Sequence, residues 1–539
     1  MDLKDKLKPL TKVEDVKRIT EFIKILPFGL KDRYQHITNL LNNTKNQEYS
    51  VTEVAGLIQT LETILPRFQD NISDVSSESA EEECSNYIKG GICNVGVVNI
   101  FPPITKCCGI LKTVASKSCT VYRSRFKPVT GFMHEIKCNK CNTLYKCSTY
   151  KVKGKELYYK DALTLDYFMS TCDTVFSKEF LNIVDIDLYR KAASFESIAY
   201  AYNDEFLGCK WMDSSNSTEI LDRRRLSEAW YKKTIIEMFT EHKIVEEIEF
   251  IKSDEIEALL EFNVEKLWKG FSKKWSSSFH TDNCKHAECS KAIIIDGHMK
   301  GTRSVCAARG VKTVESEELG TVEMSCTKMP CKGSLYCHDH KSLQMENHKA
   351  SVAKEFDNEE DSTECRTLKA KGPLKKCKTA GICASVYNCG IINGMTELYG
   401  CESLTQVYMF LVWLAKELLH FPNLLAYDDA CHLKKFIINP VRINKSQYSQ
   451  FLATLRIVVD KMHFANHVDK WCRRNVNPYT DDQFNNINTE ACEQTFQFVA
   501  KYKYTTKHMS HGKYNLFMLK LSEMFNMDRL VRNRKKSKC

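Results

Sequence analysis

The sequence of 539 residues lacks a long hydrophobic run. Its most apolar stretch, Val407 to Leu419, is interrupted by Lys416 and Glu417, whereas a membrane-spanning helix needs ~18 uninterrupted apolar residues. The first residues are charged and contain no apolar core of a secretory signal. We therefore expect a protein of the cytosol or nucleus, where reducing conditions make zinc binding a commoner use of spaced cysteines than disulfide formation.

The sequence also lacks a strong excess of charge and the common nucleotide motifs. Its 78 Lys and Arg against 68 Asp and Glu give a net charge of +10. This charge is compatible with nucleic-acid binding but excludes a histone-like polycation. No P-loop, GxSxG or dinucleotide fingerprint is present, and no repeat of fixed period. With 43% hydrophobic and 27% charged residues, the composition is that of a globular chain.

The pattern of apolar residues and cysteines predicts four regions. Residues 1–83 form an N-terminal helical region ending in an acidic, serine-rich linker, and residues 84–160 form a small β-containing module crowded with cysteines. Residues 161–280 are predicted to be helical and are a candidate DNA-binding domain. Residues 281–539 contain two predicted strands (Lys291–Asp296 and Phe421–Asp428), an apolar helix at 404–419, mostly helical residues at 446–530 and a frayed basic tail at 529–538.

Cysteines, by contrast, are abundant, since the chain has 25 of them. Cys138 and Cys141 form a CxxC knuckle, whose two thiolates can face one zinc ion. Upstream, Cys107, Cys108 and Cys119 are candidates for the remaining ligands of a tetrahedral site. The alternative is that these residues are small buried thiols of an α+β domain. The knuckle favours a zinc-binding module.

A second group of ligand-type residues lies within a short segment rich in turns. Cys326, Cys331, Cys337 and His340 can supply the three thiolates and one imidazole of a tetrahedral zinc site. His338 competes with His340, and the Cys-x-x-His spacing favours His340. Further cysteines have no partner that the spacing identifies: Cys284, Cys289, Cys306, Cys365, Cys377, Cys383 and Cys389.

A third group combines histidines and cysteines near the end of the chain. His463 and His467 are four residues apart and are predicted to lie on one helical face. With Cys431 and Cys472 they can form another structural zinc site. A hydrogen-bonded contact between two helices explains the spacing equally well.

Several carboxylates are placed where a pair of metal ions could bind. Asp296 ends one apolar strand and Asp428 another, while Glu490 and Glu493 begin a predicted helix. Two strand-borne aspartates and one helix-borne glutamate can hold two Mg²⁺ ions ~3.5–4 Å apart for phosphodiester cleavage. Asp429 adjoins Asp428 but is expected to point to the opposite face of the strand.

In this order the motifs resemble those of the Kyakuja–Dileera–Zisupton (KDZ) transposase family. That family has an Asp-Gly on a strand, a Tyr-Asp-x-x-Cys block, a His…His…Cys block and a Glu-x-x-Glu-Arg block. The chain has Asp296-Gly297, Tyr427 to Cys431, His463 to Cys472 and Glu490 to Glu493. Gln494 and Phe496 stand where the family usually has Arg and Trp. The cysteines near 107–141 resemble the zinc modules that precede KDZ domains, and the cluster at 326–340 resembles an insertion of the animal relatives.

The resemblance covers about residues 90–530 and implies a fold and an activity. The fold is an α/β RNase H-like core at 281–539, interrupted by a zinc-binding insertion at about 306–401. The activity is cleavage and strand transfer at transposon ends by Asp296, Asp428 and either Glu490 or Glu493, with Mg²⁺ or Mn²⁺ as cofactor beside Zn²⁺. The implied partners are double-stranded DNA and further copies of the chain, and the implied location is the nucleus.

A second function class stays open. A domesticated transposase would keep the zinc-dependent binding of DNA or chromatin without catalysis. Candidate DNA contacts are Arg123, Arg125 and Lys127 in the cysteine module and the run Arg223–Arg225 beside Trp230. A zinc-dependent ubiquitin ligase is disfavoured, because no RING-like succession of paired CxxC knuckles occurs.

Overall fold

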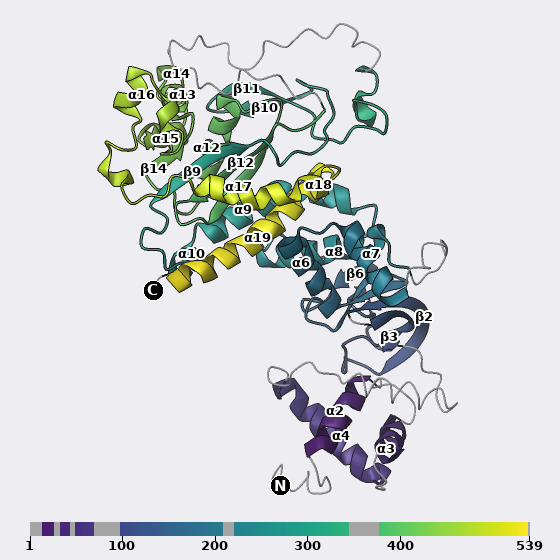
Figure 1. Cartoon of the computed structure of the whole chain (residues 1–539). Helices are drawn as coiled ribbons and strands as arrows, with labels where there is room; N and C mark the ends of the chain where they lie inside the picture. Colours follow the sequence, from purple (N-terminus) through teal and green to yellow (C-terminus); the bar gives the residue numbers. More distant parts are fainter. Residues whose placement is uncertain are drawn as a thin grey trace. The chain divides into compact units, whose positions relative to one another are not determined.

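The computed structural model describes residues 13–25, 33–43, 49–68, 98–124, 126–207, 220–343 and 377–536 (Figure 1). The chain divides into two compact units. The first comprises residues 1–185, 195–233 and 247–250, and the second comprises residues 186–194, 234–246 and 251–539. In the described residues no helix is long and apolar enough to cross a membrane.

The N-terminal part of the first unit is helical, as predicted. It contains α2 (Val13–Ile25), α3 (Arg33–Asn43) and α4 (Val51–Phe68). Their apolar residues at helical spacing form one small core, with Phe22, Leu41 and Ile58 fully buried. Helix α4 starts at a capping box, in which Ser50 and Glu53 each accept a backbone N–H of the other.

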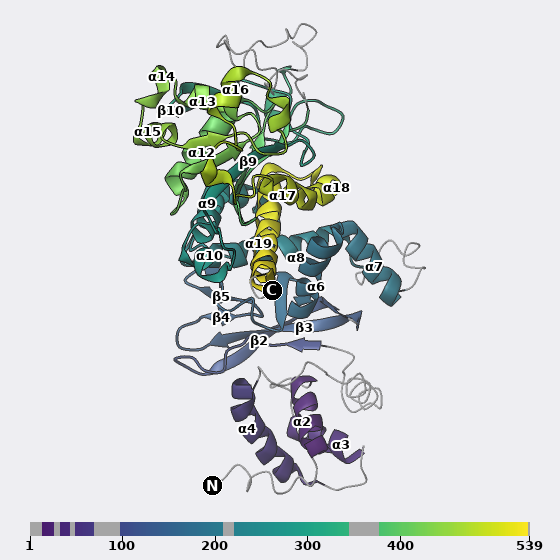
Figure 2. The ribbon, with the colours of Figure 1, turned by 60° about the vertical axis from the view of Figure 1, so that its left-hand side comes forward.

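A mixed eight-stranded sheet forms the rest of the first unit's scaffold. Its strands are β1 (Val98–Ile100), β2 (Leu111–Arg123), β3 (Phe126–Cys138), β4 (Leu144–Tyr145), β5 (Thr149–Val152), β6 (Lys155–Tyr158), β7 (Tyr167–Thr171) and β8 (Thr174–Ser177). The order is β6-β5-β4-β3-β2-β8-β7, with β1 paired to β3. The long β2–β3 hairpin is the centre of this sheet (Figure 2).

The prediction of helices throughout 161–280 is wrong in two places. Residues 167–177 form β7 and β8, because two runs of aromatic and β-branched residues flank a turn at Asp173; they pair with each other, and β8 also pairs with β2. Helices follow only as α6 (Lys178–Lys191), α7 (Phe195–Leu207) and α8 (Arg223–Glu241). The helical prediction also fails at residues 247–250, which run beside β6, so that the next helix begins at Ile256.

The second unit is built on a five-stranded mixed sheet. Its strands are β9 (Ala292–His298), β12 (Gly381–Tyr387), β13 (Ile392–Leu398), β14 (Leu424–Tyr427) and β15 (Arg456–Val458). The order is β13-β12-β9-β14-β15. Strands β13, β12 and β9 are antiparallel, whereas β9, β14 and β15 are parallel. Strand β9 is central and buried on both faces, which explains its unbroken run Ile293–Ile295.

Helices cover this sheet. They include α9 (Ile256–Trp275), α12 (Leu404–Glu417), α13 (Ala430–Ile437), α15 (Gln447–Ala453), α17 (Ala491–Val499) and α19 (His511–Lys536). Helix α17 packs on β9 and β12, and α9 packs on β13 and α19 (Figures 1 and 2). The predicted strands at 291–296 and 421–428 and the apolar helix at 404–419 are thus confirmed, with small changes of boundary.

The chain leaves the sheet after β9 and returns before β12 at a narrow neck. The Arg303 N–H donates to Thr379 Oγ1 at 3.1 Å, and the Thr379 N–H donates to the Arg303 carbonyl at 3.0 Å. Beyond the neck lies the hairpin of β10 (Lys312–Ser316) and β11 (Gly320–Met324). The expected insertion at 306–401 is therefore too long, because residues 381–398 contain the two sheet strands β12 and β13.

Within the described residues, which end at 536, the basic tail is helical and not frayed. Helix α19 continues to Lys536, and its residues Leu530 and Asn533 are buried. The Asn533 side-chain amide donates to the carbonyl of Cys389 at 3.2 Å, so the helix is held against the β12–β13 turn.

Gly381 gives a test of this architecture. Its φ is +135°, and a Cβ there would meet the backbone carbonyl of His298 on the paired strand. Gly381→Ala is expected to lower the free energy of unfolding by about 2 kcal/mol or more, measured by denaturant titration. The control is Gly320→Ala, where φ is +71° but no atom lies within 4 Å; it should cost about 1 kcal/mol. Equal losses for the two variants would contradict the close approach of β12 to β9.

Candidate acidic site and metal centres

Asp296 and Asp428 are brought together by strand pairing. In the parallel pair of β9 and β14, Tyr427 lies opposite Ile295. The next residue of each strand is an aspartate, so the two carboxylates stand side by side on one face of the sheet, at its carboxyl end. Asp296 is buried and Asp428 half-buried. Both were predicted to end a strand: Asp428 directly follows β14, whereas β9 continues for two residues beyond Asp296.

A third carboxylate, Asp460, lies beside this pair of aspartates. We call Asp296, Asp428 and Asp460 the acidic row. It lies two residues beyond Val458 of β15, just as Asp428 lies two residues beyond the paired Ala426 of β14. Asp460 is not among the predicted site residues, although it follows the apolar run Ile457–Val459 in the way that Asp428 follows its own strand. That pattern was the signal that could have found it.

His463 lies among these carboxylates rather than in a zinc site. Its Nδ1 is 2.8 Å from Asp460 Oδ2, and its backbone N–H donates to Asp460 Oδ1 at 3.0 Å. Partial burial acts to lower the pKa of His463, but the negative charges of Asp460, Asp428 and Asp296 outweigh it and raise that pKa. The pKa of His463 therefore depends on the charges of all three carboxylates.

The helix with the candidate glutamates starts beside Asp296. Glu490 is the N-cap of α17 and Glu493 lies in its first turn, and both are half-buried. Between them, the Cys492 thiol donates to the carbonyl of Ile294 in β9 at 3.0 Å. Burial raises the pKa of Cys492 well above its usual value, and the charges of Asp296 and Glu493 add to this effect. The first turn of α17 is therefore seated on the strand that carries Asp296.

The structure also explains why a glycine follows Asp296. On the face of β9 opposite to Asp296, the Glu402 carboxylate occupies the space that a Cβ at Gly297 would need. The Tyr427 hydroxyl donates to Glu402 Oε1 at 2.8 Å. The absent side chain at Gly297 thus leaves room for Glu402, the acceptor of the Tyr427 hydroxyl, on the face of β9 opposite to Asp296.

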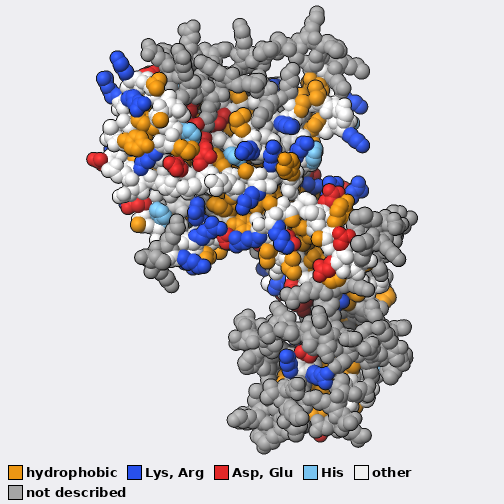
Figure 3. Space-filling view, viewed as in Figure 1, with side chains coloured by type: hydrophobic (Ala, Val, Ile, Leu, Met, Phe, Trp, Pro, Cys, Tyr) orange, Lys and Arg blue, Asp and Glu red, His pale blue; other side chains and the backbone are white. Residues whose placement is uncertain are grey.

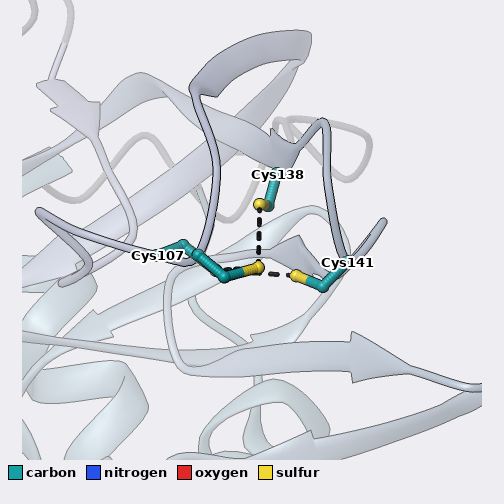
Figure 4. Close-up of side chains that lie close together, drawn as sticks. Cys107, Cys138 and Cys141 are labelled. Atoms are coloured by element: carbon teal, nitrogen blue, oxygen red, sulfur yellow. Dashed lines mark hydrogen bonds between the residues drawn. The ribbon is translucent and has the colours of Figure 1, made fainter.

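The cysteine module brings Cys107, Cys108, Cys138 and Cys141 together, with ligand atoms all within 4.8 Å of one another. The Sγ atoms of Cys107 and Cys141 are 3.5 Å apart (Figure 4). Those of Cys108 and Cys138 are 3.8 Å apart. Zinc–sulfur bonds of about 2.3 Å in a tetrahedron place neighbouring sulfurs about 3.8 Å apart. The group is therefore compatible with a zinc site of four thiolates.

Local hydrogen bonds favour the thiolate form of Cys138 and Cys141, whereas the hydrogen bond to Cys141 raises the pKa of Cys108 to about 12. The hydroxyl and the backbone N–H of Thr143 lower the pKa of Cys141 to about 6, and the backbone N–H of Cys141 lowers the pKa of Cys138. Thiolates are the form that binds zinc. Cys119 lies elsewhere, buried in the sheet core beside Gly131, and burial raises its pKa to about 11. Of the five predicted ligands, the structure does not bring Cys119 to the group.

In the insertion, the ligand-type residues that meet are Cys306, Cys326, Cys337 and His340. His340 Nδ1 lies 3.3 Å from Cys337 Sγ and 3.6 Å from Cys306 Sγ. Cys306 thus takes the place expected for Cys331, whose backbone N–H donates to the carbonyl of Tyr336. The spacing could not reveal this, because Cys306 is separated from the cluster by the whole β10–β11 hairpin.

In the last group, Cys431, His467 and Cys472 come together and are all buried. His467 Nδ1 lies 3.6 Å from Cys431 Sγ, and burial lowers the pKa of His467. The low pKa favours the neutral imidazole that binds zinc. The prediction of one helical face for His463 and His467 is wrong, because only a short 3-10 turn, Phe464–Asn466, separates them.

His432 lies closer to this group than His463 does. Its Nδ1 is 3.4 Å from Cys431 Sγ and also contacts the Asp429 carboxylate, so Asp429, Cys431 and His432 form an overlapping set of possible ligands. Asp429 thus belongs to the cysteine and histidine cluster and is buried there.

Two family models match the chain, one in the region of the acidic residues and one in the cysteine module. A model described as Kyakuja-Dileera-Zisupton transposase matches residues 307–526. A model described as CxC5 like cysteine cluster associated with KDZ transposases matches residues 95–206, which include β1 to β8, α6 and most of α7. No curated protein and no solved structure matches the chain.

The two matches place a module like the KDZ-associated cysteine cluster upstream of a region similar to a transposase domain. The family resemblance is to the KDZ transposases and lies in residues 307–526. Asp428, Glu490 and Glu493 lie inside the matched span, while Asp296 precedes it. The resemblance noted from the motifs is confirmed.

The ligand set of the insertion can be tested by zinc content. Cys306→Ser is expected to lose about one zinc ion per chain, because the exchanged atom is a soft ligand of a closed site. Cys331→Ser is the matched control and should keep the zinc content of the wild type. Bound zinc is measured by mass spectrometry of metal and protein. Loss of zinc from Cys331→Ser but not from Cys306→Ser would restore the original assignment.

Proposed function

We propose that this protein is a metal-dependent DNA transposase. Its core would be RNase H-like, and the candidate catalytic residues are Asp296, Asp428 and one of Glu490 and Glu493. The observation that carries the proposal is the register of β9 and β14, which brings Asp296 of β9 beside Asp428, the residue that follows β14, with the first turn of α17 seated on β9. The KDZ match to residues 307–526 supports the same reading.

The acidic row fits hard divalent cations, because carboxylate oxygens are the ligands that Mg²⁺ and Mn²⁺ prefer. Such ions would activate water, and later the freed 3′-hydroxyl of the transposon end, for attack on a phosphodiester. Asp296 and Asp428 would hold them from the sheet, and Glu490 or Glu493 from the helix. Asp460 keeps His463 beside the row, where the imidazole can accept or release a proton.

A basic helix beside the acidic row is suited to the DNA backbone. Helix α16 (Lys470–Asn475) carries Lys470, Arg473 and Arg474, all exposed, and Cys472 anchors it in the buried cysteine and histidine group. Figure 3 shows Lys and Arg side chains at the edge of the second unit that contains α13 and α16. Phosphate contacts of this kind position a duplex without reading its sequence.

The DNA contacts expected in the first unit need revision. Trp230 is fully buried, and its indole N–H donates to Asp185 at 2.7 Å. Arg225 donates to the Tyr122 hydroxyl at 3.1 Å. Only Arg223 and Arg224 of that run are exposed. Arg125 and the side chain of Lys127 lie outside the described residues.

We also infer a nuclear location, because the proposed substrate is DNA. Assembly into a homo-oligomer follows from the proposed chemistry, since two ends of one element have to be held together during cutting and joining.

Asp296→Asn tests the proposal. Metal-dependent nicking of plasmid DNA is expected to fall at least about 100-fold, because one ligand of the cation pair loses its charge, while binding of duplex DNA stays near the wild-type value. Asp254→Asn, an exposed aspartate of the same unit, is the control and should cut normally.

Two outcomes of this assay would decide against the proposal. Nicking by Asp296→Asn at the wild-type rate would remove Asp296 from the site. Wild-type protein that binds DNA but shows no metal-dependent nicking would favour the non-catalytic, DNA- or chromatin-binding alternative.

His463 offers an independent test of cation binding. Without divalent cations its NMR-measured pKa should lie above the ordinary ~6.5, so its protonated form is retained to a higher pH. The stability that it contributes is complete below ~6.5 and is lost as the pH rises through the raised pKa. Adding Mg²⁺ should lower this pKa, because the ion neutralises the surrounding carboxylates. His134, whose pKa burial lowers, should not respond. A His463 titration that Mg²⁺ leaves unchanged would contradict cation binding at the acidic row.

A further inference from the structure

A fourth group of ligand-type side chains lies at the opposite end of β9 from Asp296. It consists of His280, Cys284, Cys289 and Cys389, whose ligand atoms all lie within 4.8 Å of one another. Three of the four are buried and Cys289 is half-buried. They come from the short helix α10 (Ser278–Asn283), the residue that ends it, the turn before β9 and the turn between β12 and β13.

The distances match those of a tetrahedral zinc site. His280 Nε2 lies 3.4 Å from the Sγ of Cys289 and 3.4 Å from the Sγ of Cys389. With bonds of about 2.0–2.1 Å to nitrogen and 2.3 Å to sulfur, zinc places neighbouring nitrogen and sulfur ligands about 3.6 Å apart. The same His280 nitrogen thus approaches two thiols from different segments, which is the geometry of ligands that share one ion.

The surroundings hold these side chains in place. His280 Nδ1 lies 3.4 Å from the Ser290 hydroxyl, so the other nitrogen is turned to the cysteines. The His280 ring stacks on Tyr387, with the ring centres 5.4 Å apart. From α19, the Asn533 amide donates to Cys284 Sγ at 3.3 Å. Partners of this kind orient ligands and stabilise the thiolate in zinc sites.

The backbone of the two turns is fixed as well. Asn388, next to Cys389, accepts the Ala292 N–H through Oδ1 at 3.1 Å and donates its own N–H to the Ala292 carbonyl at 3.0 Å. Its Nδ2 donates to the carbonyl of Glu288, the neighbour of Cys289, at 2.5 Å. Cys289 and Cys389 are therefore held beside each other by hydrogen bonds that do not involve their thiols.

We propose that His280, Cys284, Cys289 and Cys389 form a structural zinc site. Four protein ligands, one imidazole and three thiolates, fill the tetrahedron and therefore leave no coordination position for water or substrate. The ion would join α10 and the start of β9 to the β12–β13 turn, about a hundred residues further along the chain, with α19 packed over it. This site does not depend on the proposed transposase activity, because it lies at the other end of the central strand.

The test counts bound zinc in the full-length protein. Cys289→Ser is expected to lose about one zinc ion per chain. The matched control is Cys147→Ser, because Cys147 is also a buried thiol but its Sγ contacts the Tyr167 carbonyl and the Ser148 hydroxyl. This control should keep the wild-type zinc content.

A second variant keeps the proposal testable if Cys289→Ser does not fold. His280→Cys should retain the zinc, because sites with four cysteine ligands also bind it tetrahedrally. After replacement of zinc by Co²⁺, the ligand-field and sulfur-to-cobalt charge-transfer bands of His280→Cys should shift relative to wild type, as one nitrogen ligand becomes sulfur.

Three results would overturn the proposal. They are an unchanged zinc content in Cys289→Ser, a Co²⁺ spectrum of His280→Cys identical to that of wild type, and resistance of Cys284, Cys289 or Cys389 to alkylation in unreduced protein that has been denatured with a chelator. The last result would indicate a disulfide in place of a metal.

Discussion

The register between β9 and β14 is the constraint on which the acidic site depends. A shift of one residue would turn Asp296 or Asp428 to the other face of the sheet, away from α17. Several contacts oppose such a shift. Glu402 fills the space behind Gly297 and accepts the Tyr427 hydroxyl, and Cys492 donates to β9 from the helix. The sheet thus holds close together carboxylates that would repel one another if they were free to move.

The cysteine and histidine groups serve segments that have little apolar core of their own. In the insertion, the buried cluster consists of Cys306, Ala308, Cys326, Tyr336 and Cys337, so most of its members are the ligand-type residues themselves. In the cysteine module, Cys107 and Cys108 precede β2 while Cys138 ends β3. A metal at that position joins the two open ends of the long hairpin. Small or extended elements of this kind commonly rely on metal binding for their folding free energy.

The parts of the fold and site that the sequence predicted are those with a local signal. Asp296 and Asp428 each follow a short apolar run typical of a buried strand. The CxxC spacing itself indicates that Cys138 and Cys141 bind the same ion. The predictions fail where contacts between residues far apart in the sequence determine which side chains meet. Cys331 stands at a suitable spacing, yet Cys306 occupies its place from beyond a hairpin, and Cys389 reaches its partners across about a hundred residues. His463 and His467 have a helical spacing, but a 3-10 turn separates them. His463 contacts Asp460, whereas His467 contacts Cys431.

The neck at Arg303 and Thr379 has a consequence for how such a chain can change over time. Arg303 is completely buried, and its guanidinium binds the Glu397 carboxylate at 2.7 and 3.0 Å and the Thr327 carbonyl at 2.9 Å. Both strands of the neck are therefore tied to β13 and to the base of the insertion by side chains and backbone. The insertion therefore leaves and rejoins the core at two adjacent positions. Its length and sequence can change during evolution without moving the strands that carry the acidic residues.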